Sequence, residues 1–246
     1  MLQDIINAWQ EGKHNLSDSP TFTCKYCNKH YRKESTLLAH QCEPKRRWQQ
    51  EKEAGVQVGL LAYLRFYELT QGSSKTKSYA DFVSSQYYTA FVKFGRHVRD
   101  IRAVNPKQFI DYVITKNKKI DFWCHDSTYM EYLTQYLKKE AVQDALERAL
   151  LEMQSYADSH PELRNGFKDY FKYGSPNRIC YDIVNGRISP WVVYNCSSGV
   201  EFLETLNDEQ IALIIDSIDP SIWHNKFNLY VSDTEWIRSV LEQAGL

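Results

Sequence analysis

The sequence predicts a mainly α-helical fold with a small β-hairpin, an α+β protein in which a short cysteine-rich module precedes a larger helical domain. Three observations support this fold class. Apolar residues recur at helical spacing through much of residues 56–161. An Asn-Gly pair at 185–186 separates two apolar runs, as the turn of a hairpin does. Three of the six cysteines lie between positions 24 and 42, and such crowding is typical of a metal site.

The first part of the chain divides into an arm, the cysteine-rich module and a connector. Residues 1–19 predict an amphipathic helix and lack the charged and apolar regions of a secretory signal. The apolar positions of this helix are Leu2, Ile5, Ile6 and Trp9. Residues 20–44 contain the clustered cysteines. Residues 45–55 are rich in charge and predict a helical connector that ends near Gly55.

Residues 56–246 predict one mostly helical domain. A first helix stops at Gly72, and two short helices follow, with Ser78 as the N-cap of the first. Asn105 caps the next helix, which begins at Pro106. The clearest periodicity follows in residues 122–161, and three further helices close the chain. The positions expected to face the core are Leu60, Leu61, Leu64, Tyr67, Phe82, Phe91, Phe94, Val98, Leu133, Leu137, Ala141, Leu146, Leu150, Met153 and Ala157.

The hairpin is predicted over residues 178–195. If Val184 pairs with Arg187, alternate residues share one apolar face. These are Ile179, Tyr181, Ile183, Ile188, Val192 and Tyr194. Pro190 would make its strand an edge strand. Arg178, Asp182 and Arg187 would then pair as charges across the two strands.

Four residues near the N-terminus have the chemistry and spacing of metal ligands. They are Cys24, Cys27, His40 and Cys42. Two residues separate the first pair, which allows a tight turn to bring both thiolates onto one ion. One residue separates the second pair, so the helix expected from about Glu34 must end or tighten there. Pro44 is consistent with that end. Three thiolates and one imidazole predict a closed, structural site with no open position for catalysis.

Around these ligands the sequence resembles the C2H2 zinc-finger family. Tyr31 and Leu37 hold the places of the aromatic and the leucine that form the small core of such a finger, and His40 holds the place of its first histidine. Cys42 stands instead of the second histidine, so the module is a C2HC-like variant. The resemblance implies a structural Zn²⁺. His30 is an alternative ligand, although its place in a finger points outward.

The resemblance also indicates which residues would contact DNA. The base-reading positions fall on Lys33, Thr36 and Ala39, a weak set, and a lone finger spans only about three base pairs. Phosphate-binding chemistry is stronger, because basic residues and one aromatic cluster in and after the finger. The candidate binding residues are Lys25, Lys29, Arg32, Lys33, Thr36, Lys45, Arg46, Arg47 and Trp48. Nucleic acid, DNA or RNA, and a partner protein are therefore the two alternatives.

The composition and the absence of certain motifs argue against several other classes of protein function. The net charge of −1 gives no chain-wide attraction to nucleic acid, and no apolar stretch approaches a membrane span. No phosphate-binding loop or nucleophile elbow is present. Cys124 is adjacent to His125, but neighbouring side chains diverge and cannot easily act together. We therefore expect a non-enzymatic protein of a reducing, cytoplasmic compartment, with no membrane and no small-molecule substrate.

Several stretches also resemble uncharacterised proteins of T4-like tailed phages. They are CEPKRRWQQ, TQGSSKTKSYADFV, FVKFGRHVRDI and GRISPWVVYN. The resemblance covers most of the chain and brings no catalytic residues with it. It implies action in the host bacterial cytoplasm or in the virion. The finger would then serve phage nucleic-acid binding or, as the alternative, dock onto another protein during assembly, for example of the tail baseplate.

Overall fold

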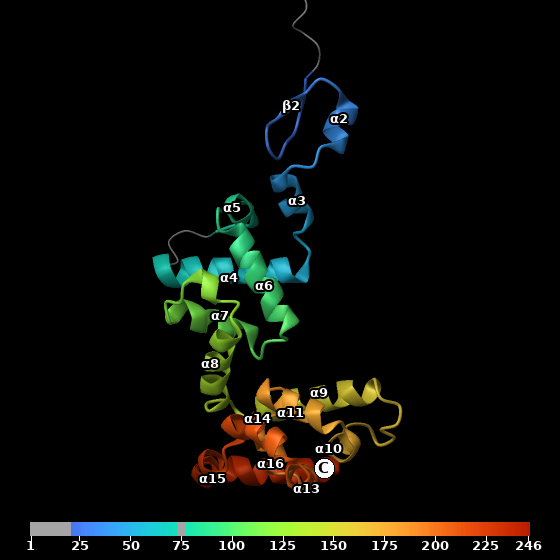
Figure 1. The fold of residues 1–246 in the computed structure, drawn as a ribbon. Coiled ribbons are helices and arrows are strands. Elements are labelled where there is room, and N and C mark those ends of the chain that lie inside the picture. The colour runs from blue at the N-terminus through green and yellow to red at the C-terminus, as the bar shows by residue number, and fades with distance from the viewer. Residues whose placement is uncertain (1–20, 73–76) are drawn as a thin grey trace, which may run out of the picture. The chain divides into compact units, whose positions relative to one another are not determined.

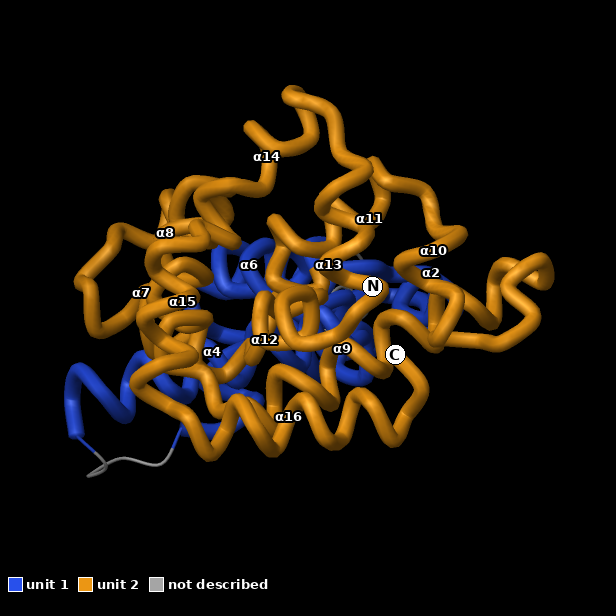
Figure 2. Tube along the Cα trace, turned by 90° about the horizontal axis from the view of Figure 1, so that it is seen from below, with its two compact units in different colours: residues 1–101 blue, residues 102–246 orange. Residues whose placement is uncertain are grey.

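The computed structural model describes residues 21–72 and 77–246, and the helix expected over residues 1–19 lies outside them. The described chain is mainly α-helical with a small two-stranded antiparallel sheet, which confirms the predicted fold class (Figure 1). It divides into two compact units, Met1–Ile101 and Arg102–Leu246 (Figure 2). The division falls inside the segment 56–246 that the sequence suggested as one domain.

Unit 1 contains the cysteine-rich module and the helices that follow it. Its elements are β1 (Phe22–Thr23), β2 (His30–Tyr31), α2 (Glu34–Ala39), α3 (Glu43–Gln49), α4 (Ala54–Gln71), α5 (Tyr79–Ser84) and α6 (Tyr88–Asp100). Ser78 caps α5 in a capping box with Asp81, as its position predicts. Pro44 lies in the first turn of α3, so it starts a second helix as well as following the end of α2.

Helices α4 and α6 meet backbone to backbone at three glycines. A Cβ on Gly95 would lie 2.1 Å from the carbonyl oxygen of Gly55 and 2.4 Å from the amide nitrogen of Gly59. Only residues without a side chain allow such an approach. Gly55, expected at the end of the connector, therefore belongs to the packed face of α4.

The buried face of α4 differs from the expected one. Val56, Ala62 and Tyr63 are buried, whereas Leu61 is 40% exposed. The small residues let α6 approach and so decide which side of α4 faces inward. On α6 and α5 the expectation is confirmed, because the predicted inward side chains are buried. These are Phe82, Phe91, Phe94 and Val98.

Unit 2 consists of helices, and those from residue 142 onward share one apolar core. Its elements are α7 (Pro106–Thr115), η1 (Ile120–Phe122), α8 (Asp126–Leu137), α9 (Val142–Asp158), η2 (Gly166–Asp169), α10 (Tyr170–Tyr173), α11 (Pro176–Val184), α12 (Pro190–Val193), α13 (Ser197–Glu204), α14 (Asp208–Ile218), α15 (Pro220–Leu229) and α16 (Val231–Ala244). Asn105 and Asn207 cap α7 and α14 with their side chains. Met153, Ile183 and Trp191 are among the fully buried residues of the core.

Residues 178–195 do not form the predicted hairpin. Pro176 occupies the first turn of α11, and the apolar side chains Ile179, Cys180 and Ile183 are buried along that helix. Short apolar runs fit both the helical and the strand period, so the pattern alone did not distinguish them. Pro190 likewise begins the short helix α12 rather than marking an edge strand.

The Asn-Gly pair ends α11 instead of turning a hairpin. Gly186 has a φ of 69° and donates its backbone N–H to the carbonyl of Ile183 at 2.9 Å. The N–H of Arg187 reaches the carbonyl of Asp182 at 2.8 Å. These two bonds form a Schellman motif, in which the left-handed glycine closes the helix. A two-residue hairpin turn also needs a residue with positive φ, so an Asn-Gly pair fits both structures. The hairpin prediction was wrong for this reason.

The charges expected to pair across strands form a buried network on α9 and α11. The Asp182 carboxylate is fully buried and accepts hydrogen bonds from Tyr170 at 2.9 Å, Arg178 at 2.7 Å and Arg187 at 3.2 Å. Arg178 also donates to Glu152 at 3.0 Å. Several donors thus satisfy each buried carboxylate, which offsets the cost of burying its charge.

Candidate metal centre

The β1–β2 hairpin brings the first two predicted ligands together. Cys24 lies just after β1, and a tight turn carries the chain through Cys27 back to β2. Asn28 adopts a left-handed φ of 56° in this turn and donates its N–H to the carbonyl of Cys24 at 2.8 Å. Asparagine is one of the few side chains that tolerate this conformation. The turn therefore fixes both thiols on the same side of the hairpin.

The other two ligands lie where the chain passes from α2 to α3. Helix α2 ends at Ala39, and both His40 and Cys42 have extended backbones. The single-residue gap is thus accommodated outside a helix, as its spacing predicts. Lys45 on α3 donates to the carbonyl of His40 at 2.9 Å, which holds this corner in place.

All four predicted ligands form one cluster. Their ligand atoms lie within 4.8 Å of one another. The sulfurs of Cys24 and Cys42 are 3.9 Å apart, and the Cys27 sulfur is 3.2 Å from Nε2 of His40. A tetrahedral ion with metal–sulfur bonds of about 2.3 Å places two such sulfurs about 3.8 Å apart. The cluster can therefore hold one four-coordinate metal ion.

His30, the alternative ligand, is outside this cluster. Its side chain is exposed, and its Nδ1 lies 2.8 Å from the hydroxyl of Thr23 on the paired strand. Tyr31, the next residue, turns the other way, with its ring centre 5.0 Å from that of His40. The alternation of side chains along β2 thus separates the small core from the solvent side.

The thiols of the cluster influence one another electrostatically. Burial raises the pKa of Cys24, but hydrogen bonds from the backbone of Tyr26 and Cys27 outweigh it, so that this pKa lies below its ordinary value. A backbone hydrogen bond at Lys29 lowers the pKa of Cys27, yet burial and the neighbouring Cys24 and Cys42 raise it overall. Closely packed sulfurs of this kind are most readily deprotonated together when a cation lies between them.

Most of the predicted binding residues are exposed. On the finger and its connector, these exposed side chains are Lys25, Lys29, Arg32, Lys33, Thr36 and Arg46. We call the five basic members of this set, Lys25, Lys29, Arg32, Lys33 and Arg46, the basic surface. Lys33 precedes the first residue of α2, and its side chain makes no capping bond.

Arg47 and Trp48, which the sequence suggested as binding residues, make packing contacts within unit 1. Arg47 donates to the carbonyls of Val83 at 2.6 Å and Ser85 at 3.2 Å, and its guanidinium lies 4.5 Å from the ring centre of Tyr88. Its side chain is only 17% exposed. These contacts attach α3 to α5 and α6 within unit 1.

Trp48 takes part in the same packing. Its ring meets that of Tyr79 edge-on, with the centres 5.1 Å apart. The hydroxyl of Tyr79 donates to the carbonyl of Arg47 at 2.7 Å. The basic and aromatic residues that the sequence grouped together therefore divide into two sets. One set forms the exposed basic surface, and Arg47 and Trp48 attach α3 to the rest of unit 1. No sequence signal separated them, because the partners of Arg47 lie far along the chain.

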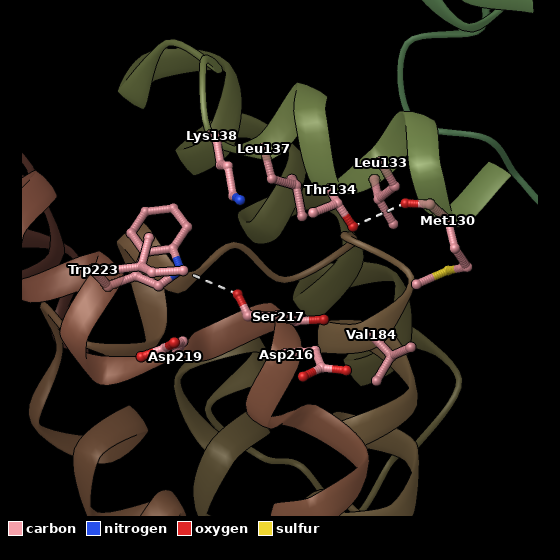
Figure 3. A pocket seen from close by; sticks show the side chains of 11 residues that line it. Met130, Leu133, Thr134, Leu137, Lys138, Val184, Asp216, Ser217, Asp219 and Trp223 are labelled. Carbon is pink, nitrogen blue, oxygen red and sulfur yellow. Dashed lines mark hydrogen bonds between the residues drawn. The ribbon is translucent and has the colours of Figure 1, made fainter. Parts of the chain in front are cut away.

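A small cavity in unit 2 lies between α8, α14 and α15 (Figure 3). Leu133 and Leu137 line one side of it, and Ser217, Asp219 and Trp223 line the other. Its volume is about 30 Å³, far below the roughly 300–1,000 Å³ of typical ligand sites. It is therefore too small for a substrate or a cofactor.

No family model, curated protein or solved structure matches this chain. The resemblance to tailed-phage proteins accordingly finds no support, and the zinc-finger interpretation depends on ligand spacing and geometry. None of the helices in the described residues is long and apolar enough to cross a membrane.

Proposed function

We propose that this protein is a non-enzymatic zinc-finger protein that binds nucleic acid through the basic surface. The observation that carries the proposal is the four-ligand cluster bordered by exposed lysine and arginine side chains. DNA and RNA both present the phosphates that such side chains bind. The resemblance to phage proteins remains only a sequence-based prediction, and so does the compartment it implies.

Zinc is the metal that best suits the four ligands. Three thiolates and one imidazole in a closed tetrahedral set are typical of structural Zn²⁺ sites in small modules. Calcium and magnesium prefer oxygen ligands, and the cluster contains no carboxylate. The ion would carry out no reaction here. It would join the hairpin to the corner after α2 and so hold the basic surface in shape.

The charge near the finger favours phosphate. Residues 21–50 contain seven lysine and arginine side chains and only two carboxylates, Glu34 and Glu43. Arg47 pairs with Glu43, so within residues 21–50 only Glu34 remains to offset the five residues of the basic surface. The base-reading set of Lys33, Thr36 and Ala39 is weak. We therefore expect affinity from phosphate contacts and little sequence preference.

Salt-dependent binding tests this function. The metal-loaded protein is titrated with labelled single- and double-stranded DNA and with RNA at low and moderate salt. We expect binding that weakens with salt, and a triple Lys29→Ala/Arg32→Ala/Lys33→Ala variant should lower the salt slope by about 1 for each phosphate that it no longer binds. The matched control is Lys93→Ala/Lys107→Ala/Lys116→Ala, which removes equal charge from exposed sites elsewhere.

Two results would contradict the proposal. One is no binding at low salt by a protein whose metal content is confirmed. The other is an equal reduction of affinity in both triple variants, which would attribute the effect to overall charge.

A second candidate is docking of the finger onto a partner protein. Leu38 on α2 is 71% exposed, which is unusual for a leucine in so small a module. An exposed apolar side chain suits a protein surface better than a phosphate backbone. Leu38→Ala should leave nucleic-acid binding and its salt slope unchanged, and absence of nucleic-acid binding would favour this candidate.

A further inference from the structure

A shallow cleft in unit 2 has the size of a ligand site. It consists of two hollows of about 400 and 490 Å³, both lined by Tyr136 and Asp144. Ligand sites in proteins commonly have volumes of about 300–1,000 Å³. Because the two hollows share these lining residues, they form one cleft. Its walls come from α7, α8, α9 and the residues beside them.

Three tyrosines form an aromatic row along one hollow. The ring centre of Tyr132 lies 5.6 Å from that of Tyr112 and 5.6 Å from that of Tyr136. Tyr132 is buried, and its hydroxyl donates to the carbonyl of Val104 at 2.9 Å, so its ring is fixed. Tyr112 and Tyr136 on either side are half-buried and border the cleft. The row thus offers a firm aromatic surface for a ligand.

The charged groups of the cleft largely neutralise one another. Arg148 pairs with the fully buried carboxylate of Glu140, and its Nε donates to the carbonyl of Gly186 at 2.7 Å. Arg102 pairs with Glu152 through two hydrogen bonds of 2.6 and 3.1 Å. In both pairs the carboxylate is buried, whereas the Arg102 side chain is about half exposed, so the pairs present donors and acceptors to the cleft. They give the cleft little net field to attract an ion of either sign.

The exposed rim adds further groups of both kinds. Gln108, Gln135 and Lys139 can donate, and the carboxylates of Asp144 and Glu147 accept. A ligand with many groups that both donate and accept hydrogen bonds would find a partner for each of them along the cleft. Hydroxyl groups have this property. The C–H faces of sugar rings also pack on aromatic rings, whose faces carry partial negative charge.

We propose that this cleft binds a neutral oligosaccharide. Tyr136 supplies a stacking surface at the junction of the two hollows, and Asp144 accepts hydrogen bonds from the sugar hydroxyls there. The cleft lies in unit 2 and involves no residue of the finger, so the proposal goes beyond the proposed function and does not depend on it.

Saturation-transfer NMR on the full chain tests the proposal with three probes, maltotriose, cellotriose and triacetylchitotriose. We expect transfer to at least one of them, with a dissociation constant of about 0.1–10 mM. Tyr136→Ala should weaken this binding about tenfold, whereas Tyr136→Phe, which keeps the ring, should stay within about twofold. Asp144→Ala should weaken it about fivefold by removing an acceptor.

The controls separate binding from folding. Glu162→Ala removes an exposed carboxylate outside the cleft and should leave the affinity unchanged. Asp144 is also exposed, so its variant tests the site even if Tyr136→Ala disturbs folding. The proposal is overturned if none of the three sugars shows transfer, or if binding persists in both Tyr136→Ala and Asp144→Ala. Binding of spermidine with the same residue dependence, in place of sugar, would overturn it as well.

Discussion

Lys226 shows how much the surroundings of a single residue determine its chemistry. Its Nζ lies 4.6 Å from the ring centre of Trp223 and 5.1 Å from that of Trp191, and donates to the carbonyl of Leu137 at 3.1 Å. Burial lowers its pKa from 10.5 to about 8, although Glu140 and Asp233 act in the opposite direction. Its ammonium group is thus placed where the charged form is costly.

The pH dependence of stability should reveal this cost. Between pH 8 and pH 10.5 the unfolded chain retains the Lys226 proton that the folded chain has lost. Stability from this residue therefore rises with pH across that window, by about 1 kcal/mol once solvent screening is allowed for. The measurement is urea unfolding at about pH 7 and about pH 9.5.

Lys226→Met provides the comparison, because it keeps an apolar stem without the charge. As pH rises, the unfolding free energy of wild type should increase relative to that of the variant. Any advantage of the variant at about pH 7 should therefore shrink or reverse. A difference that is constant with pH would mean that Lys226 keeps its ordinary pKa.

At the scale of elements, the crossing of α4 and α6 depends on the glycines described above. Gly95→Ala would place a methyl group against the backbone of Gly55. Alanine normally favours a helix over glycine by about 1 kcal/mol. Here the overpacking should dominate, and we expect the unfolding free energy to fall by about 3 kcal/mol.

Urea denaturation measures this decrease, and hydrogen exchange at α4 and α6 would assign it to unit 1. Lys93→Ala, at an exposed position of the same helix, is the control and should change stability by less than about 0.5 kcal/mol. A Gly95→Ala protein as stable as the control would show that the two helices can separate without cost.

The elements also show which features the sequence could predict. The caps at Ser78 and Asn105 and the clustering of the four proposed metal ligands were predicted correctly, because these signals depend on residues close together in the chain. The hairpin was wrong because a left-handed glycine at 186 serves two structures equally. The role of Arg47 was missed because its partners lie on α5 and α6.

At the scale of the whole molecule, the proposed metal and the helical packing would stabilise different parts. The finger contains one short helix of 6 residues and strands of 2 residues each, too little to fold without further support. Small modules of this kind depend on their metal for folding. The remaining helices bury large apolar cores of their own.

Metal removal should therefore disorder the finger and spare the rest. With excess 1,10-phenanthroline we expect release of one equivalent of zinc and new tryptic cleavage at Lys25, Lys29, Arg32 and Lys33. The far-UV circular dichroism should fall by only a few per cent, since α2 is so short. Mass spectrometry of the fragments locates the cleavage. Equal cleavage with and without chelator would contradict a metal-dependent finger.

The corner at His40–Cys42 also bears on how this protein could have evolved. Glu43 begins α3 directly after the last ligand, and Lys45 binds the carbonyl of His40. The chain therefore has no spare linker through which a duplicated copy of the module could follow it along a nucleic acid. Adding a copy of the module after Cys42 would therefore require this helix to be displaced.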